Sequence, residues 1–348
     1  MKLFTCQSCG QSLYFENTAC ERCGHRLGFI PDIVTLSALE PDGDAWRTLT
    51  DPPRTMRFCD NAAHDACNWL VDADSDQTLC EACRHNETIP DLSDPANLLQ
   101  WRKLEAAKHR LFYSLLRLGL AFPDRGQDTE NGLGFDFLAD LPSEPHVMTG
   151  HDNGLITIAL VEADDAERER RRTEMHEPYR SLLGHFRHEV GHYVWDRLIR
   201  DGGQLEACRG LFGDDEQDYA AALERNYQDG PPLDWQDHFV SAYASSHAWE
   251  DWAETWAHYL HIIDTLETAR AFGLTVRPHD VQDRSLNATV RFDPYGKVPI
   301  ETIIEAWLPL TFAMNSLNRS MGNADLYPFV LSQPVIEKLG FVHDILRQ

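Results

Sequence analysis

Hydrophobic residues recur at three- and four-residue intervals in several long segments of the chain. This pattern predicts an amphipathic helix over Trp101–Leu120, dominates from Pro178 to Gly273, and returns over Ile300–Leu317 and Pro334–Leu346. Between the first two segments, NGLITIALV indicates a turn followed by a strand that ends near Val161. The predicted fold class is therefore α+β, with a mainly helical domain and a small sheet.

The composition is that of a globular chain with more than one domain. Its 348 residues are 43% hydrophobic and 25% charged, which suits a domain of ordinary size with small appendages. The first ten residues lack the apolar stretch of a secretory signal, and clean apolar runs such as Leu155–Val161 are too short to cross a bilayer. We therefore expect a cytoplasmic protein without a membrane partner.

The formal net charge of −25 disfavours nucleic acid as a partner. Nucleic-acid binding relies on Lys and Arg side chains that neutralise phosphates. Each zinc ion held by four thiolates would add a further charge of about −2. We expect no nucleic-acid binding, and the simplest role of the charge is solubility.

Eight of the nine cysteines fall into two sets of four, and Cys208 is left over. The first set is Cys6, Cys9, Cys20 and Cys23, spaced C-x2-C-x10-C-x2-C, with a glycine directly after each pair. Two tight turns that present two thiolates each are typical of a zinc ribbon, where the ion joins segments with almost no core. A redox motif needs only one pair, so a structural zinc is the favoured interpretation.

The second set of cysteines has a wider first spacing. It consists of Cys59, Cys67, Cys80 and Cys83, which favour a second structural zinc. The alternatives are buried free thiols, or a ligand role for His64 or His85 in place of one cysteine. These patterns divide the chain into a zinc ribbon at 1–30, a second cysteine-rich module at 31–95, a bridging helix at 96–125 and a larger domain at 126–348.

The segment LLGHFRHEVGHYVWDRLI contains H-E-x-x-H within a helical pattern. His188 and His192 are four residues apart, so one face of the helix presents both imidazoles to one ion. Glu189 stands beside them, where a carboxylate can take the proton of a metal-bound water. Gly191 costs about 1 kcal/mol of helix propensity, which indicates that another backbone or a ligand approaches closely there.

A zinc site of this kind needs a third protein ligand. The chain lacks the longer pattern H-E-x-x-H-x-x-G-x-x-H, but the later helical segment HAWEDWAETWAHYLHI supplies Glu250 and Glu254, four apart on one face. Spacing alone allows either acid; by similarity to the gluzincin arrangement, in which the first acid of E-x-x-x-D/E reaches the ion, we assign Glu250 as the third ligand. We assign Glu254 as its support, which accepts a hydrogen bond from a ligating histidine. Asp251 and His258 are the competing residues.

Together, these motifs make the chain resemble a family of bacterial zinc-binding metallopeptidases that carry an N-terminal zinc-ribbon region. The resemblance covers nearly the whole chain and is carried by CQSCG, CERCGHRLGFIPD, LCEACRHNETIPDLSDPANL, WRKLEAAKHRL, GHFRHEVGHYVWDRL and WEDWAETWAHYLHIIDTL. It implies a zincin-like catalytic domain with a peptidase fold of gluzincin type, whereas the individual substrate does not follow from it. From the count of complete ligand sets we expect one catalytic and two structural zinc ions, and we expect a peptide or protein as substrate.

Two further expectations come from this resemblance. Tyr243, seven residues before Glu250, resembles in position the tyrosine that helps to hold the oxyanion in some gluzincins; a packed surface aromatic is the alternative. Gluzincin-like sites also present an edge strand to their substrate, so an extended substrate is expected along the strand near Leu155–Leu160.

Two other functions stay open from the sequence. One is a zinc-ribbon adaptor whose peptidase-like domain binds peptides without hydrolysing them, and the other is a metal-dependent hydrolase of a non-peptide amide. An adaptor predicts a broken site, whereas every expected catalytic residue type is present. Water activation at a metal would serve peptide and non-peptide amides alike.

Overall fold

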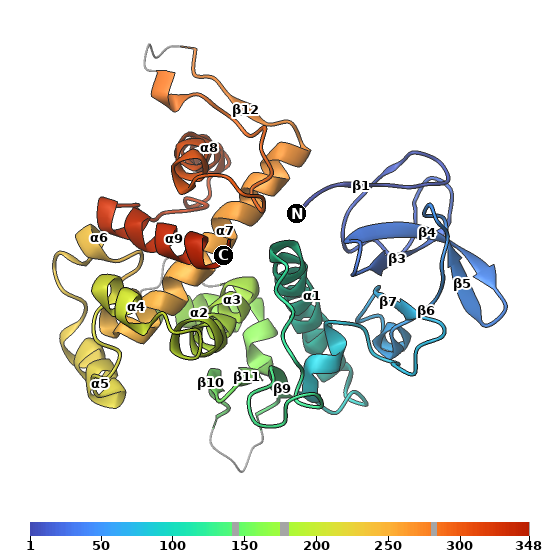
Figure 1. Ribbon diagram of the computed structural model, residues 1–348, viewed down its shortest axis with the longest axis horizontal. Helices are drawn as coiled ribbons and strands as arrows, with labels where there is room; N and C mark the ends of the chain where they lie inside the picture. Colours follow the sequence, from blue (N-terminus) through green and yellow to red (C-terminus); the bar gives the residue numbers. More distant parts are fainter. Residues whose placement is uncertain (141–145, 175–180, 280–283, 348) are drawn as a thin grey trace. The chain divides into compact units, whose positions relative to one another are not determined.

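The computed structural model describes residues 1–140, 146–174, 181–279 and 284–347 (Figure 1). The chain divides into two compact units, residues 1–168 and 169–348. Most strands belong to the first unit, and the second unit is mainly helical. This distribution confirms the α+β fold class.

The first unit contains a five-stranded antiparallel sheet in the order β3–β4–β5–β6–β7. Its strands are β3 (Arg26–Ile30), β4 (Thr35–Asp42), β5 (Ala45–Thr48), β6 (Thr55–Phe58) and β7 (Leu70–Asp72), preceded by a hairpin of β1 (Phe4–Thr5) and β2 (Ser12–Leu13). Strand β3 comes from the predicted ribbon at 1–30 and the other four come from the predicted module at 31–95. The two cysteine-rich segments therefore share one sheet.

A second sheet of the same unit has the order β10–β11–β9–β8. Its strands are β8 (Asn86–Thr88), β9 (Gly134–Leu138), β10 (Gly150–Asp152) and β11 (Leu155–Ala159). The strand expected from NGLITIALV is confirmed as β11. The expectation that this strand is an edge is wrong, because β11 pairs antiparallel with β10 and parallel with β9. Its backbone groups are engaged on both sides, so an extended substrate cannot add to it.

Strand β9 also pairs with β8, which directly follows the second cysteine set. Residues 134–159 therefore belong with the N-terminal unit. The boundary between the two compact units lies after residue 168.

Helix α1 (Pro95–Leu118) is longer than the helix predicted from Trp101. The side chain of Asp94 accepts a hydrogen bond from the backbone N–H of Ala96, and Pro95 occupies the first helical position. The helical periodicity begins only at Trp101, but this Asp-Pro cap starts the helix six residues earlier, close to residue 96, where the bridging helix was placed. Gly119, with a φ of 72°, ends the helix near its predicted limit. The short 3₁₀ helices η1 (Asp60–His64), η2 (Cys83–His85) and η3 (Leu160–Ala163) complete this unit, and α2 (Asp165–Glu174) runs across the boundary.

The second unit is organised around α7 (Ala248–Ala271), which packs against α3, α4, α8 and α9. The other helices are α3 (Leu182–Val194), the π-helical turn η4 (Trp195–Arg200), α4 (Leu205–Phe212), α5 (Tyr219–Asp229), α6 (Trp235–His238), η5 (Tyr243–Ser246), η6 (Arg284–Leu286), α8 (Ile300–Ser320) and α9 (Gln333–Ile345). Strands β12 (Thr275–Val276) and β13 (Ala288–Thr289) form a small hairpin. The two C-terminal helices are confirmed close to their predicted bounds, whereas residues 178–180 of the predicted helical region lie outside the described residues.

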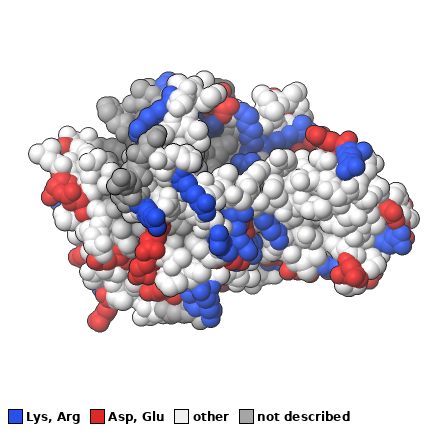
Figure 2. Space-filling view, turned by 90° about the horizontal axis from the view of Figure 1, so that it is seen from above, with Lys and Arg blue, Asp and Glu red and all other residues white. Residues whose placement is uncertain are grey.

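The surface carries both signs of charge. On the face drawn in Figure 2, Lys and Arg side chains form short groups separated by uncharged surface, with acidic side chains at several points around them. No helix within the described residues is long and apolar enough to cross a membrane.

Candidate metal centres

The first cysteine set converges on one point in the first unit. Gly10 and Gly24 adopt φ angles of 75° and 76°, which let each turn fold back beside its cysteine pair. The Sγ atoms of Cys6 and Cys23 are 3.6 Å apart, as are those of Cys9 and Cys20. A tetrahedral zinc with bonds of about 2.3 Å separates its sulfur ligands by about 3.8 Å, whereas a disulfide brings two sulfurs to about 2.05 Å. The spacing fits an ion held by thiolates.

The second set also converges, from η1, η2 and the segments beside them. Cys59, Cys67, Cys80 and Cys83 offer ligand atoms within 4.8 Å of one another, and the Sγ atoms of Cys67 and Cys80 are 3.7 Å apart. The backbone N–H groups of Trp69 and Cys80 donate to the sulfurs of Cys67 and Cys59. These four thiols therefore have the separations that a second structural zinc requires.

The two histidines considered as substitute ligands do not join this cluster. The Nδ1–H of buried His85 donates to the carbonyl oxygen of Leu133 at 2.8 Å. Burial lowers the pKa of His85 to about 4, so the ring is neutral at pH 7. His64 is exposed and packs against the ring of Trp101.

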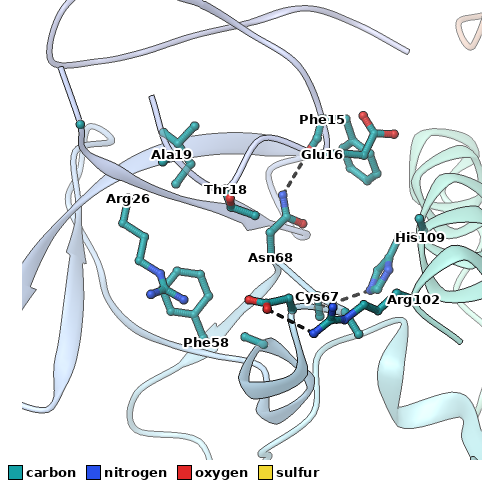
Figure 3. Close-up of a pocket in the computed structure, with 16 residues that line it drawn as sticks. Phe15, Glu16, Thr18, Ala19, Arg26, Phe58, Cys67, Asn68, Arg102 and His109 are labelled. Atoms are coloured by element: carbon teal, nitrogen blue, oxygen red, sulfur yellow. Dashed lines mark hydrogen bonds and ion pairs between the residues drawn. The ribbon is translucent and has the colours of Figure 1, made fainter. Parts of the chain in front are cut away.

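A third histidine, His109 of α1, lies beside Cys67 of the second cysteine cluster (Figure 3). Its Nε2 is 3.3 Å from the Sγ of Cys67 and 3.6 Å from the Sγ of Cys83. A cavity of about 400 Å³ reaches Cys67 and His109, and Cys67 is 9% exposed, whereas the other three thiols are at most 1% exposed. The sequence reasoning missed His109, although a histidine on the buried face of an amphipathic helix could have indicated it.

A buried ion pair on α1 surrounds the same cluster. Lys108 and Glu105 are both fully buried, 2.9 Å apart, and Asn86 bonds to both of them. The other oxygen of Glu105 lies 3.6 Å from the Sγ of Cys83. Since four thiolates around a zinc ion carry a net charge of about −2, Lys108 supplies the nearby positive charge that such a buried site needs.

In the second unit, α3 and α7 bring together His188, His192 and Glu250. The Nε2 atoms of the two histidines are 3.2 Å apart, and the Oε2 atom of Glu250 lies 3.0 Å and 3.5 Å from them. Ligands bonded to a tetrahedral zinc at about 2.05 Å lie about 3.3 Å apart. Glu250 is 1% exposed, and its Oε2 has no hydrogen-bond donor among the described residues. A buried carboxylate oxygen left without a donor beside two imidazoles fits a cation.

Glu254 lies one turn after Glu250 and supports the first histidine. The Nδ1–H of His188 donates to Oε1 of Glu254 at 2.7 Å, which leaves Nε2 to face the centre. The hydroxyl of Ser241 donates to the other oxygen of Glu254 at 2.6 Å. Burial opposes the charge of this carboxylate, but the hydrogen bond and charge of His188 lower its pKa to about 2. Glu254 is therefore ionised and keeps the imidazole in one orientation.

The competing ligands Asp251 and His258 point elsewhere. Asp251 forms a buried ion pair with Lys338 of α9 at 2.6 Å. The Nδ1 of His258 shares a hydrogen bond with the hydroxyl of Tyr327 at 2.7 Å. Both side chains are thus committed to contacts within the core.

The carboxylate of Glu189 is almost buried, at 9% exposure, and forms no hydrogen bond or ion pair with any described residue. The ring of Tyr243 lies 6.0 Å from that of His188. A second tyrosine, Tyr219, donates its hydroxyl to Oε1 of Glu250 at 2.5 Å. Burial and the charge of Glu250 raise the pKa of both phenols, so both are protonated donors. The sequence reasoning missed Tyr219.

Close packing of α3 on α7 sets these separations. Trp252 of α7 donates its indole N–H to the carbonyl oxygen of Gly191 at 2.9 Å. A Cβ at position 191 would lie 2.9 Å from the ring of Trp256, which confirms that another element approaches the helix at this glycine. The indole of Trp249 stacks on the ring of His192 with centroids 3.7 Å apart.

Comparisons with known proteins match two parts of the chain. A family described as "Putative zinc-binding metallo-peptidase" matches residues 97–345, and a zinc-ribbon domain matches residues 3–94. Uncharacterized proteins of Mycobacterium tuberculosis and Mycobacterium bovis are 44% identical over 349 residues, which cover 100% of this chain and 96% of theirs. No solved structure matches the chain significantly.

Proposed function

Because this chain belongs to that family of zinc-binding metallo-peptidases, we propose that it hydrolyses peptide bonds at the centre formed by His188, His192 and Glu250. The observation that carries this proposal is the group of three ligand atoms 3.0–3.5 Å apart beside Glu189. The arrangement is of the gluzincin type, in which H-E-x-x-H on one helix is completed by a glutamate from a later helix.

When bound there, zinc would lower the pKa of a water molecule towards neutrality and polarise the substrate carbonyl. Glu189 takes the proton of that water and delivers it to the departing amine. The phenol of Tyr243 donates a hydrogen bond to the oxygen that becomes negative in the transition state. Glu254 keeps the His188 ring oriented, and no other described residue competes for the Glu189 carboxylate.

The two cysteine clusters would hold structural zinc, which brings the proposed total to one catalytic and two structural ions. Eight cysteines arranged for metal suit a reducing compartment, so we propose a cytoplasmic location. The net charge of −25 disfavours a nucleic acid as partner, and the proposed substrate is a peptide or protein.

The test is cleavage of a diverse peptide library, followed by mass spectrometry of the products. Glu189→Gln keeps the size of the side chain and removes the base, so it should retain zinc and lose turnover by orders of magnitude. Glu305→Gln is the matched control, since Glu305 is exposed on α8 and has no partner among the described residues. It should cleave like the wild type.

Undiminished turnover by Glu189→Gln would contradict the mechanism. If the wild-type protein binds library peptides and cleaves none, the adaptor function is favoured. Cleavage of non-peptide amides alone, in a parallel screen, would favour the other hydrolase.

A further inference from the structure

The two oxygens of the Glu250 carboxylate have different surroundings. Oε2 lies 3.0 Å and 3.5 Å from the Nε2 atoms of His188 and His192, whereas Oε1 accepts the hydroxyl hydrogen bond of Tyr219 at 2.5 Å. We propose that Tyr219 is a positioning residue that makes Glu250 bind the metal through one oxygen only. This inference rests on the metal centre of the proposed function and adds a residue that controls its coordination.

The consequence for chemistry lies in the number of ligands. A catalytic zinc keeps one position open for water or substrate beside three protein ligands. A carboxylate can bind through one oxygen or through both, and a second bond from Glu250 would take up that position. A short hydrogen bond to Oε1 stabilises the charge on that oxygen and favours the one-oxygen arrangement.

Tyr219 is held in place by contacts with the start of α7. It is the first residue of α5, and Asp218 caps this helix by accepting the N–H of Ala221 at 3.0 Å. The Nε2–H of His247 donates to the carbonyl oxygen of Gln217 at 3.1 Å. His247 is also the N-cap of α7, where its Nδ1 accepts the N–H of Trp249. The segment before α5 is thereby tied to the helix that carries Glu250.

Ring contacts extend this support to a second ligand. The Tyr219 ring packs edge-on against His247 at 5.3 Å and against Trp249 at 5.6 Å. Trp249 in turn stacks on His192. Tyr219 is 36% exposed, so removal of its hydroxyl creates no buried cavity.

Tyr243 has a different place in this arrangement. The hydroxyl that donates to Glu250 is that of Tyr219. In the proposed mechanism the hydroxyl of Tyr243 donates instead to the substrate oxygen. The two tyrosines should then give different results when each loses its hydroxyl.

The experiment compares Tyr219→Phe, Tyr243→Phe and, as a control, Tyr14→Phe, whose ring is 55% exposed in the first unit. A chelator removes metal from the catalytic site while the cysteine-bound zinc ions stay in place. Zinc affinity is then measured by competition, and the site is refilled with Co²⁺ to record its visible spectrum, which reports coordination number.

Tyr219→Phe should weaken zinc binding by about 10- to 100-fold and shift the Co²⁺ spectrum to the weaker absorption of five-coordinate metal. Tyr243→Phe and Tyr14→Phe should keep wild-type affinity and spectrum. Retention of the two cysteine-bound zinc ions and an unchanged thermal midpoint establish that each variant is folded.

Wild-type affinity and an unchanged spectrum in Tyr219→Phe would overturn the inference, as would an equal effect of Tyr243→Phe. Neither readout needs peptide cleavage. If the metal results are as expected and the wild type cleaves no peptide, the proposed peptidase function fails while the role of Tyr219 stands.

Discussion

Replacement of Gly191 by alanine tests the packing that holds His192 against Glu250. A Cβ at this position would lie 2.9 Å from Cδ1 of Trp256, 3.1 Å from Cα of Ala253 and 3.3 Å from the carbonyl oxygen of Ala253. The two atoms of Ala253 belong to the backbone of α7 and cannot rotate away. The added methyl group must therefore push α3 and α7 apart by a few tenths of an ångström.

Two opposing effects set the change in stability. Alanine gains about 1 kcal/mol of helix propensity over glycine, while overpacking of a tight contact costs about 1–3 kcal/mol. Gly210 in α4 is the matched control, because nothing lies within 4 Å of a Cβ built there. Since the propensity gain is common to both, Gly191→Ala should be less stable than Gly210→Ala by the strain alone, about 1–3 kcal/mol.

Denaturant unfolding of the two variants, followed by tryptophan fluorescence in excess zinc, measures this difference. Competition with a chelator should also show weaker zinc binding in Gly191→Ala, because its two histidines move relative to Glu250. Gly210→Ala should bind zinc like the wild type. Equal stability of the two variants, with wild-type zinc affinity in both, would refute the argument that the α3–α7 contact sets the geometry of the centre.

Three other predictions concern the metal sites and a buried histidine. Metal analysis of the intact protein should give three zinc ions per chain; a value near one, with the eight clustered cysteines readily alkylated, would contradict the cysteine sites. Glu250→Ala should abolish or severely weaken zinc binding at the catalytic centre, whereas Glu254→Ala should weaken it by about 10- to 100-fold. Zinc affinity measured by chelator competition checks this ranking. A larger loss in Glu254→Ala than in Glu250→Ala would mean that Glu254 is the ligand and Glu250 its support. Burial lowers the pKa of His85 from 6.5 to about 4, so its contribution to stability is present above pH 6.5 and is lost as the pH falls towards 4. Unfolding measurements should show that the free energy of unfolding falls by about 2 kcal/mol between pH 7 and pH 5 because of this group. His85→Asn, whose amide can still donate to Leu133, should reduce this dependence on pH. An unchanged pH dependence in His85→Asn would count against the buried neutral ring.

Much of the candidate site could be predicted because its residues are close in sequence. Cysteine pairs three residues apart share a turn, and His188 and His192, four apart, share a helix face. Glu250 and Glu254 have the same relation, and the structure directs one towards the imidazole Nε2 atoms and the other to Nδ1 of His188. Their roles in metal binding stay predictions.

The sequence was a poorer guide to contacts between segments. The apolar periodicity placed the start of the first long helix at Trp101, whereas the Asp94–Pro95 cap begins α1 six residues earlier. The strand pattern of β11 was recognised, but alternating side chains do not tell whether a strand has one neighbour or two. His109 has Glu105 four residues before it on α1, but neither residue follows the cysteine spacing that identified the cluster they contact. Tyr219 belongs to none of the motifs that the sequence singled out.

The sequence by itself determined which chemical groups share a turn or a helix face, because the backbone geometry of turns and helices fixes such short spacings. It thereby identified two cysteine clusters and a His-Glu-His helix with a later pair of glutamates. Only the tertiary structure decided that α1 brings His109 to Cys67, 42 residues away, and that α5 brings Tyr219 to Glu250, 31 residues away. The physical reason is that such contacts depend on how the buried faces of distant elements pack together, as α3 packs on α7 at Gly191. Local periodicity shows which face of an element is buried but does not show which other element covers it.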